Sequence, residues 1–169
     1  MLIALSLTVL FWVFSSGWSL RVTFVPGMIA TIWLYLRFMR GRNLSSPFLN
    51  ELYLLGIAWQ LIHFAEEYLT RFDVRFPMLF GGLPYPRDTF VVFNLFSYAV
   101  FIMGWLGVRR GIKPLFIPAL FFVTYGMIGN AIAHPIFCLL AGGYFPGMYT
   151  ALGYWLLGPL TLREMLRST

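Results

Sequence analysis

The feature that most constrains this chain is a run from residue 114 to residue 162 without a single Asp, Glu, Lys or Arg. A membrane-spanning helix needs about 20 mostly apolar residues, so this run is long enough for two spans. The segment 141–147, rich in glycine, is typical of a turn that divides them. Because 60% of all residues are hydrophobic and only 11% are charged, with a mean hydropathy of +0.79, the composition lies outside the range of soluble domains. The sequence therefore predicts an all-α, polytopic transmembrane helical bundle.

Six spans fit the apolar pattern. The two within residues 114–162 are preceded by predicted spans at residues 1–20, 22–39, 52–69 and 89–108. Almost no loop separates the first two, so the alternative is five spans, with residues 1–40 forming a tight or interfacial hairpin. The only long connection, 70–88, is rich in proline, glycine and aromatic residues, which favours a lid or a re-entrant element. The length leaves room for one membrane domain, residues 1–169.

The basic residues indicate an orientation in the lipid bilayer and no nucleic-acid partner. The net charge of +6 comes from residues scattered over several connections, without the stripe or helical face that binds nucleic acid. With six spans, the side of both termini has eight basic residues and the other side four, so the positive-inside rule predicts cytoplasmic termini. The first set is Arg37, Arg40, Arg42, Arg109, Arg110, Lys113, Arg163 and Arg167, and the second is Arg21, Arg71, Arg75 and Arg87. The single Cys138 excludes an intramolecular disulfide.

Three ionisable residues, His63, Glu66 and Glu67, lie inside the predicted span 52–69. An ionisable side chain at membrane depth costs about 2.5–3.5 kcal/mol on insertion scales, so such residues persist where they face a protein interior or a wet cavity. Positions i, i+3 and i+4 of a helix share a face, which predicts that all three side chains project together. Gln60 adds a polar group one turn earlier.

Two further polar stripes are predicted at the same depth. Asn130, His134 and Cys138 follow at steps of four on one span, and Asn94, Ser97 and Tyr98 open another. In an alternating bundle these ends lie on the same side as the His63 motif, and the cost of burying polar groups drives them to face one another. The sequence therefore predicts a shared polar pocket that is open toward that leaflet. Its supporting residues are predicted to be Asn130, Gln60, Asn94, Tyr98 and Tyr144.

Several functions suit such a pocket. His63, Glu66, Glu67 and His134 are the residue types that hold a single divalent transition metal, Zn or Fe. Alternatively, one of the adjacent carboxyl groups holds a proton at neutral pH, and the pair, with the imidazoles, catalyses acid–base chemistry on a lipophilic small molecule. A non-catalytic alternative is a metal- or lipid-binding protein that forms a homo-oligomer or belongs to a membrane complex. The last alternative is a purely structural network of buried hydrogen bonds.

The motif His63-x-x-Glu66-Glu67 resembles the one that names the HXXEE family of bacterial membrane proteins. Residues 130–134 (Asn-Ala-Ile-Ala-His) are similar to that family's second motif, and residues 143–151 to its tyrosine–proline–glycine turn before a last span. The resemblance covers residues 54–162 and implies a four-helix core, residues 50–165, to which residues 1–40 are added. It implies a bacterial inner-membrane protein whose defining positions are His63, Glu66, Glu67, Asn130 and His134. It implies no reaction, because the family has no established function.

Overall fold

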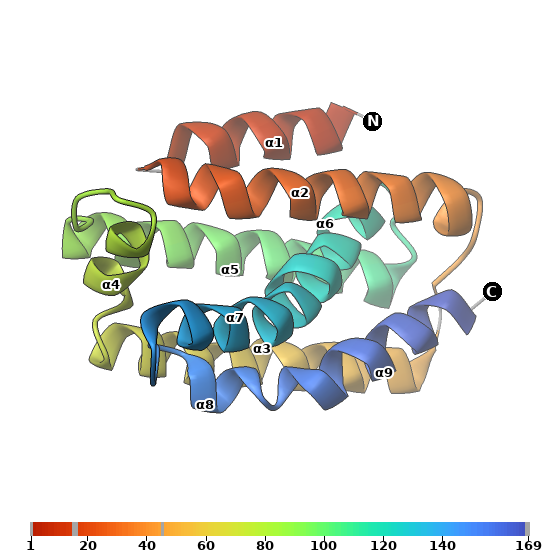
Figure 1. Ribbon diagram of the computed structural model, residues 1–169. Helices are drawn as coiled ribbons and strands as arrows, with labels where there is room; N and C mark the ends of the chain where they lie inside the picture. The colour runs from red at the N-terminus through yellow and green to blue at the C-terminus, as the bar shows by residue number, and fades with distance from the viewer. Residues whose placement is uncertain (1, 15–16, 45, 168–169) are drawn as a thin grey trace.

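The computed structural model describes residues 2–14, 17–44 and 46–167, and this part of the chain is helical without any strand (Figure 1). The all-α prediction is therefore confirmed for these residues. The α-helices are α1 Leu2–Phe14, α2 Trp18–Leu34, α3 Pro47–Leu69, α4 Phe72–Leu79, α5 Arg87–Arg110, α6 Phe116–Phe121, α7 Asn130–Ala141, α8 Met148–Ala151 and α9 Tyr154–Arg167. A π-helical turn, Tyr35–Met39, extends α2. A 3-10 turn, Lys113–Leu115, precedes α6, and a π-helical segment, Phe122–Gly129, joins α6 to α7.

Within the described residues, three helices are long and apolar enough to cross a membrane, as expected of a membrane protein: Trp18–Met39, Arg87–Arg110 and Lys113–Ala141. The prediction of six spans is not confirmed. At a rise of 1.5 Å per residue, the 13 residues of α1 and the 14 residues of α9 reach only about 20 Å, short of the roughly 30 Å of a bilayer core. Helix α3 has 23 residues, but three of them are acidic.

The N-terminal segment is a hairpin rather than a full span followed by a second one. Helix α2 begins at Trp18, after Gly17 in extended conformation (φ −168°, ψ 169°), so the predicted boundary between residues 20 and 22 is wrong. Helix α1 lies along α2 (Figure 1), and Phe11 of α1 stacks on Phe24 of α2 with ring centroids 4.4 Å apart. Met1, Ser15 and Ser16, which belong to the first predicted span, lie outside the described residues.

The charge-free run forms the centre of the bundle. Its first part, together with the preceding Lys113, forms one continuous helical rod, Lys113–Ala141. This rod packs against α2, α5 and α9 (Figure 1). Phe121, Phe122 and Val123 at its middle are fully buried. π-Helical insertions of this kind are frequent at functional sites, because they change the direction in which the following side chains point. Here the insertion ends at Gly129, directly before the predicted polar stripe of α7.

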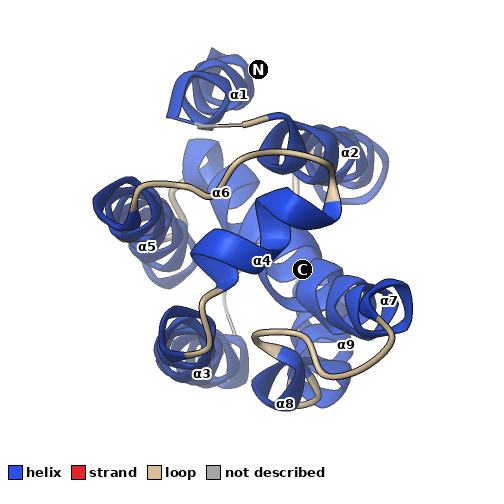
Figure 2. Ribbon diagram, turned by 60° about the vertical axis from the view of Figure 1, so that its left-hand side comes forward, coloured by secondary structure: helices blue, strands red, loops and turns tan. Residues whose placement is uncertain are grey.

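Two connections close the end of the bundle where α3 and α7 terminate. The predicted lid, residues 70–88, folds into the short helix α4, which crosses that end between the surrounding helices (Figure 2). Its Phe72 and Phe76 stack at 4.6 Å. The second connection turns at Gly142 and Gly147, both with positive φ (70° and 86°), and leads into α8 against α3. The start of α1 and the end of α9 lie at the opposite end of the bundle (Figure 1).

Candidate functional site

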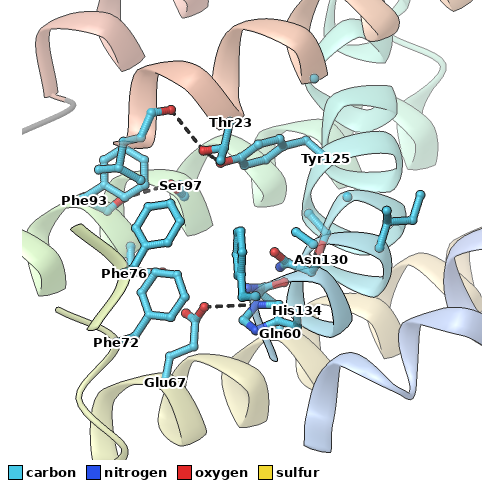
Figure 3. A pocket seen from close by; sticks show the side chains of 18 of the residues that line it. Thr23, Gln60, Glu67, Phe72, Phe76, Phe93, Ser97, Tyr125, Asn130 and His134 are labelled. Atoms are coloured by element: carbon cyan, nitrogen blue, oxygen red, sulfur yellow. Dashed lines mark hydrogen bonds and ion pairs between the residues drawn. The ribbon is translucent and has the colours of Figure 1, made fainter. Parts of the chain in front are cut away.

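A cavity of about 410 Å³ lies between α2, α3, α4, α5 and the central rod. Its walls are mainly apolar and include several aromatic rings, and Figure 3 shows the rings of Phe72, Phe76 and Phe93 facing the polar side chains of α3 and α7. The polar residues that line it are Thr23, Gln60, Glu67, Tyr85, Asn94, Ser97, Thr124, Tyr125, Asn130 and His134. The volume lies within the range of about 300–1,000 Å³ that is usual for small-molecule sites.

His63, Glu67 and His134 form a cluster at one end of this cavity, where Glu67 and His134 line the cavity and His63 lies behind them. Glu67 Oε1 lies 3.5 Å from Nε2 of His63 and 3.5 Å from Nε2 of His134. The three residues are 0%, 7% and 1% exposed, and one ligand atom from each lies within 4.8 Å of the others. Figure 3 shows Glu67 and His134 facing each other across the cavity end. The structure thus brings together two helices that the sequence separates by about 70 residues.

Glu66 lies outside this cluster. Its carboxylate accepts four hydrogen bonds from the connection after α7 and from α8. The donors are Tyr144 Oη at 2.8 Å, Tyr149 N at 3.1 Å, Thr150 N at 2.8 Å and the Thr150 hydroxyl. The prediction that Glu66 and Glu67 project together into one pocket is therefore wrong. Consecutive residues point about 100° apart on a helix, and here the two carboxylates face different neighbours.

The hydrogen bonds of Thr150 determine which nitrogen of His63 carries the proton. Thr150 Oγ1 lies 2.8 Å from Nδ1 of His63 and donates its only proton to Oε2 of Glu66. Because four donors surround the Glu66 carboxylate, Glu66 is the acceptor, and the Thr150 oxygen then accepts a proton from His63 Nδ1. This tautomer leaves a lone pair on His63 Nε2, which points toward Glu67.

Lone pairs therefore converge where His63 and Glu67 meet His134. His63 Nε2 has no hydrogen-bond partner within the described part of the chain, and neither has Nδ1 of His134. A buried carboxylate and an imidazole lone pair repel each other unless a proton or a metal ion lies between them. A proton or a metal ion between these atoms would remove the repulsion, and no hydrogen bond among the described residues supplies the proton to His63 Nε2.

The supporting residues divide into two groups. Gln60, Asn94 and Asn130 line the cavity as predicted, and the Gln60 side-chain oxygen accepts a hydrogen bond from the Tyr154 hydroxyl. Tyr98 is buried but does not line the cavity, and Tyr144 lies on the outer side of α3 with Glu66. Neither tyrosine lines the cavity, and Tyr144 supports the site only through its hydrogen bond to Glu66. Cys138, on the same predicted stripe as His134, does not join the cluster.

Sequence reasoning missed three contributors. Thr150 and Tyr154 lie after the glycine-rich turn, and only the docking of that turn brings them to α3; an isolated hydroxyl among apolar residues carries no signal of this. The wall formed by α2, with Thr23 and Gly27, was also missed, because the N-terminal hairpin was treated as an addition to the core. Thr23 Oγ1 lies 3.4 Å from the Tyr125 hydroxyl at this wall (Figure 3).

No protein-family model, no curated protein and no solved structure matches this chain. The resemblance to the HXXEE family therefore stays a prediction, and the function rests on the geometry of the site.

Proposed function

We propose that this chain is an integral membrane enzyme that binds one divalent transition-metal ion, Zn or Fe, through His63, Glu67 and His134. The ion lies at the polar end of the aromatic cavity and acts on a lipophilic small molecule held there. Glu66 is not a ligand in this proposal. Its role is to hold Thr150, and through it His63, in the orientation that metal binding needs. We also propose a bacterial inner-membrane location with cytoplasmic termini, and membership of the HXXEE family.

The observation that carries the proposal is the convergence of the three ligand atoms, among which the described residues form no hydrogen bond. Metal–ligand bonds of about 2.0–2.1 Å at tetrahedral angles place ligand atoms about 3.3–3.4 Å apart. The two separations of 3.5 Å at Glu67 Oε1 are close to that value and too long for good hydrogen bonds. Two imidazoles and one carboxylate are a donor set typical of zinc and non-haem iron sites.

The second coordination shell supports the same proposal. Histidines that bind metals usually donate their other ring N–H to an oxygen, which fixes the tautomer and raises the basicity of the ligand nitrogen. His63 does so to Thr150 Oγ1 at 2.8 Å, and the charged Glu66 lies behind that hydroxyl. A purely structural network would satisfy its buried polar atoms, whereas here the nitrogen that faces Glu67 has no partner in the described residues.

Three protein ligands leave a coordination position for a substrate or a water molecule. A metal ion held by His63, Glu67 and His134 would polarise a carbonyl or hydroxyl oxygen bound to it and stabilise negative charge on that oxygen. The mainly apolar lining of the cavity lowers the local polarity, which strengthens such electrostatic effects. The residues of this chain bind the apolar part of the substrate and hold the ligands in place.

Elemental analysis of the purified full-length chain tests the proposal. After incubation with Zn²⁺ or, without oxygen, with Fe²⁺, and removal of the excess, we expect about one ion per wild-type chain. We expect loss of that ion in Glu67→Gln and in His134→Ala. Cys138→Ala is the matched control, because Cys138 lies one helical turn after His134 and outside the cluster, and it should keep the ion.

Two results would contradict the metal site. One is a wild-type protein that retains neither metal. The other is metal that persists in both ligand variants while each elutes and unfolds like the wild type. If no metal binds, the remaining reading is proton transfer at Glu67, which lies between two imidazoles.

The proposed orientation has its own test. Reporter proteins that are active on only one side of the membrane, fused after Arg167, should report a cytoplasmic C-terminus, and a periplasmic signal would refute this part of the proposal.

A further inference from the structure

We propose that the ligand of the cavity is a neutral lipophile with a terminal hydroxyl group, a long-chain alcohol, and that it enters from the lipid phase through a mouth between α2 and α7. This inference rests on the proposed function for the position in a bilayer and for the metal at the polar end of the cavity. It deepens that function by naming the substrate class and its route.

The mouth is identified by residues that both line the cavity and face outward. Val22 on α2 and Ile132 and Ile136 on α7 line the cavity and are 41%, 50% and 47% exposed. Helices α2 and α7 lie on the same side of α4 (Figure 2). Helix α2 packs closely on α4 and on the π-helical segment Phe122–Gly129. It does not pack along α7, as far as the described residues show. The cavity therefore reaches the surface between these two helices.

The mouth has defined ends. At the inner end, Tyr125 packs so closely on α2 that a Cβ at Gly27 would lie 2.5 Å from Tyr125 Cδ2. The hydroxyl groups of Thr31 and Thr124 form a hydrogen bond of 2.7 Å there. At the other end, Phe76 of α4 lines the cavity. Both helices beside the mouth belong to segments long and apolar enough to cross a membrane. The opening therefore faces acyl chains in the proposed bilayer rather than water.

The polar end of the cavity selects the head group. None of the residues that line the cavity is Lys or Arg, so an anionic head group finds no cationic side chain there. Asn94 Nδ2 donates to Phe90 O at 3.0 Å, and Asn130 Nδ2 donates to Gly126 O at 2.9 Å. A backbone carbonyl can only accept, so these bonds fix the orientation of both amides.

Both amide oxygens consequently remain available as acceptors, and no described residue donates to either. A ligand that fits has a hydrogen-bond donor for an amide oxygen and a lone pair for the metal. A hydroxyl group supplies both from one atom, with the O–H directed to Asn130 or Asn94 and the oxygen to the ion. The aromatic walls take the hydrocarbon chain.

Photolabelling in liposomes tests the inference with the full-length chain. The probe is a long-chain primary alcohol with an alkyl diazirine in its tail, and labelled peptides are mapped by mass spectrometry. We expect labels on cavity residues such as Phe72, Phe93 and Tyr125, with or without metal. In the metal-free protein, unlabelled alcohol should compete, and the fatty acid and the lysophospholipid of equal chain length should not, because no Lys or Arg lines the cavity.

Two sets of variants separate the mouth from the head-group site. Ile132→Trp with Ile136→Trp fills the mouth and should abolish cavity labelling, whereas Leu139→Trp, at a position on the same helix that is 81% exposed and does not line the cavity, should not. Asn130→Leu removes an acceptor and should weaken competition by the alcohol about tenfold, with Cys138→Ala as its control.

The outcomes distinguish this inference from the metal site. If the wild type retains no metal but is labelled in the cavity in a way that depends on the mouth, the inference is supported and only the metal site is refuted. Labels confined to the outer surface overturn the inference even if the metal binds. Labelling that survives the filled mouth, or fatty acid that competes as well as alcohol, also overturns it.

Discussion

Replacing Thr150 by valine tests the most specific feature of the site, the hydroxyl between Glu66 and His63. Valine has nearly the shape of threonine, so the change removes one oxygen and little packing. In the wild type this oxygen accepts from His63 Nδ1 and donates to Glu66. In the variant Glu66 keeps three donors, but the Nδ1 proton of a fully buried imidazole loses its acceptor.

The size of the effect follows from that lost acceptor. A buried donor without a partner costs about 1–3 kcal/mol. The metal-free variant avoids this cost by moving the proton to Nε2, where it faces Glu67 at 3.5 Å. Metal binding must reverse that change, because the ion needs the Nε2 lone pair. The cost therefore appears in the metal affinity, and we expect a loss of about 10- to 100-fold, the range usual for such supporting residues.

The assay is a competition titration of the purified protein with a chelator of known affinity. Thr150→Ser keeps the hydroxyl and is the matched control, for which we expect an affinity close to that of the wild type. Unchanged affinity in a folded Thr150→Val protein would refute the assignment of the His63 tautomer. An equal loss in the serine and valine variants would show that packing, and not the hydroxyl, is responsible.

Three further predictions concern the connection that docks on α3. Gly147 has φ 86°, and a Cβ there would overlap Cε1 of His134 and lie 2.9 Å from its Nδ1. Gly147→Ala should therefore lower both the melting temperature and the metal content. A Cβ at Gly143 meets no atom within 4 Å, so the control Gly143→Ala should change neither. Glu66→Gln keeps the size of the side chain but weakens four hydrogen bonds, and should weaken metal binding without abolishing it in the same chelator titration. Burial, with the neighbouring Glu66 carboxylate, raises the pKa of Tyr144 above its ordinary 10.0, so its hydrogen bond stabilises the protein below pH 10 and is lost as the pH rises through the higher pKa of the folded state. Thermal unfolding should therefore distinguish Tyr144→Phe from the wild type at about pH 8, and the difference should shrink in strongly alkaline buffer.

The fold was predictable where it depends on composition and not where it depends on helix ends. The run 114–162 predicted a membrane helix, and Lys113–Ala141 is one of the helices long enough to span. The same run did not reveal that its second half is broken into α8 and α9. That break occurs where Gly153 packs against the indole of Trp59, at a distance that would leave a Cβ 2.6 Å from the ring. A hydropathy pattern contains no information on such a contact.

The site was predictable as a set of residue types at one depth, because burial cost forces isolated polar residues of neighbouring helices toward each other. His63, Glu67, His134, Asn94 and Asn130 indeed meet at one end of the bundle. Which carboxylate faces the cavity was not predictable, because i+3 and i+4 are equally close to His63 along the helix. The orientation of Glu66 is determined about 80 residues later in the chain, where the backbone N–H groups of Tyr149 and Thr150 donate to its carboxylate.

The two adjacent glutamates therefore differ in function for a geometric reason. A metal site on one face of α3 needs Glu67 as a ligand and His63 in the correct tautomer, and the tautomer is determined on the face where Glu66 lies. A single carboxylate cannot reach both faces, since neighbouring side chains diverge by about 100°. Two acids in succession let one helix hold a charged ligand toward the cavity and a second, fully hydrogen-bonded charge behind the histidine. On this reasoning, Glu67→Gln should abolish metal binding and Glu66→Gln should only weaken it, and the reverse order would show that the ligand is Glu66.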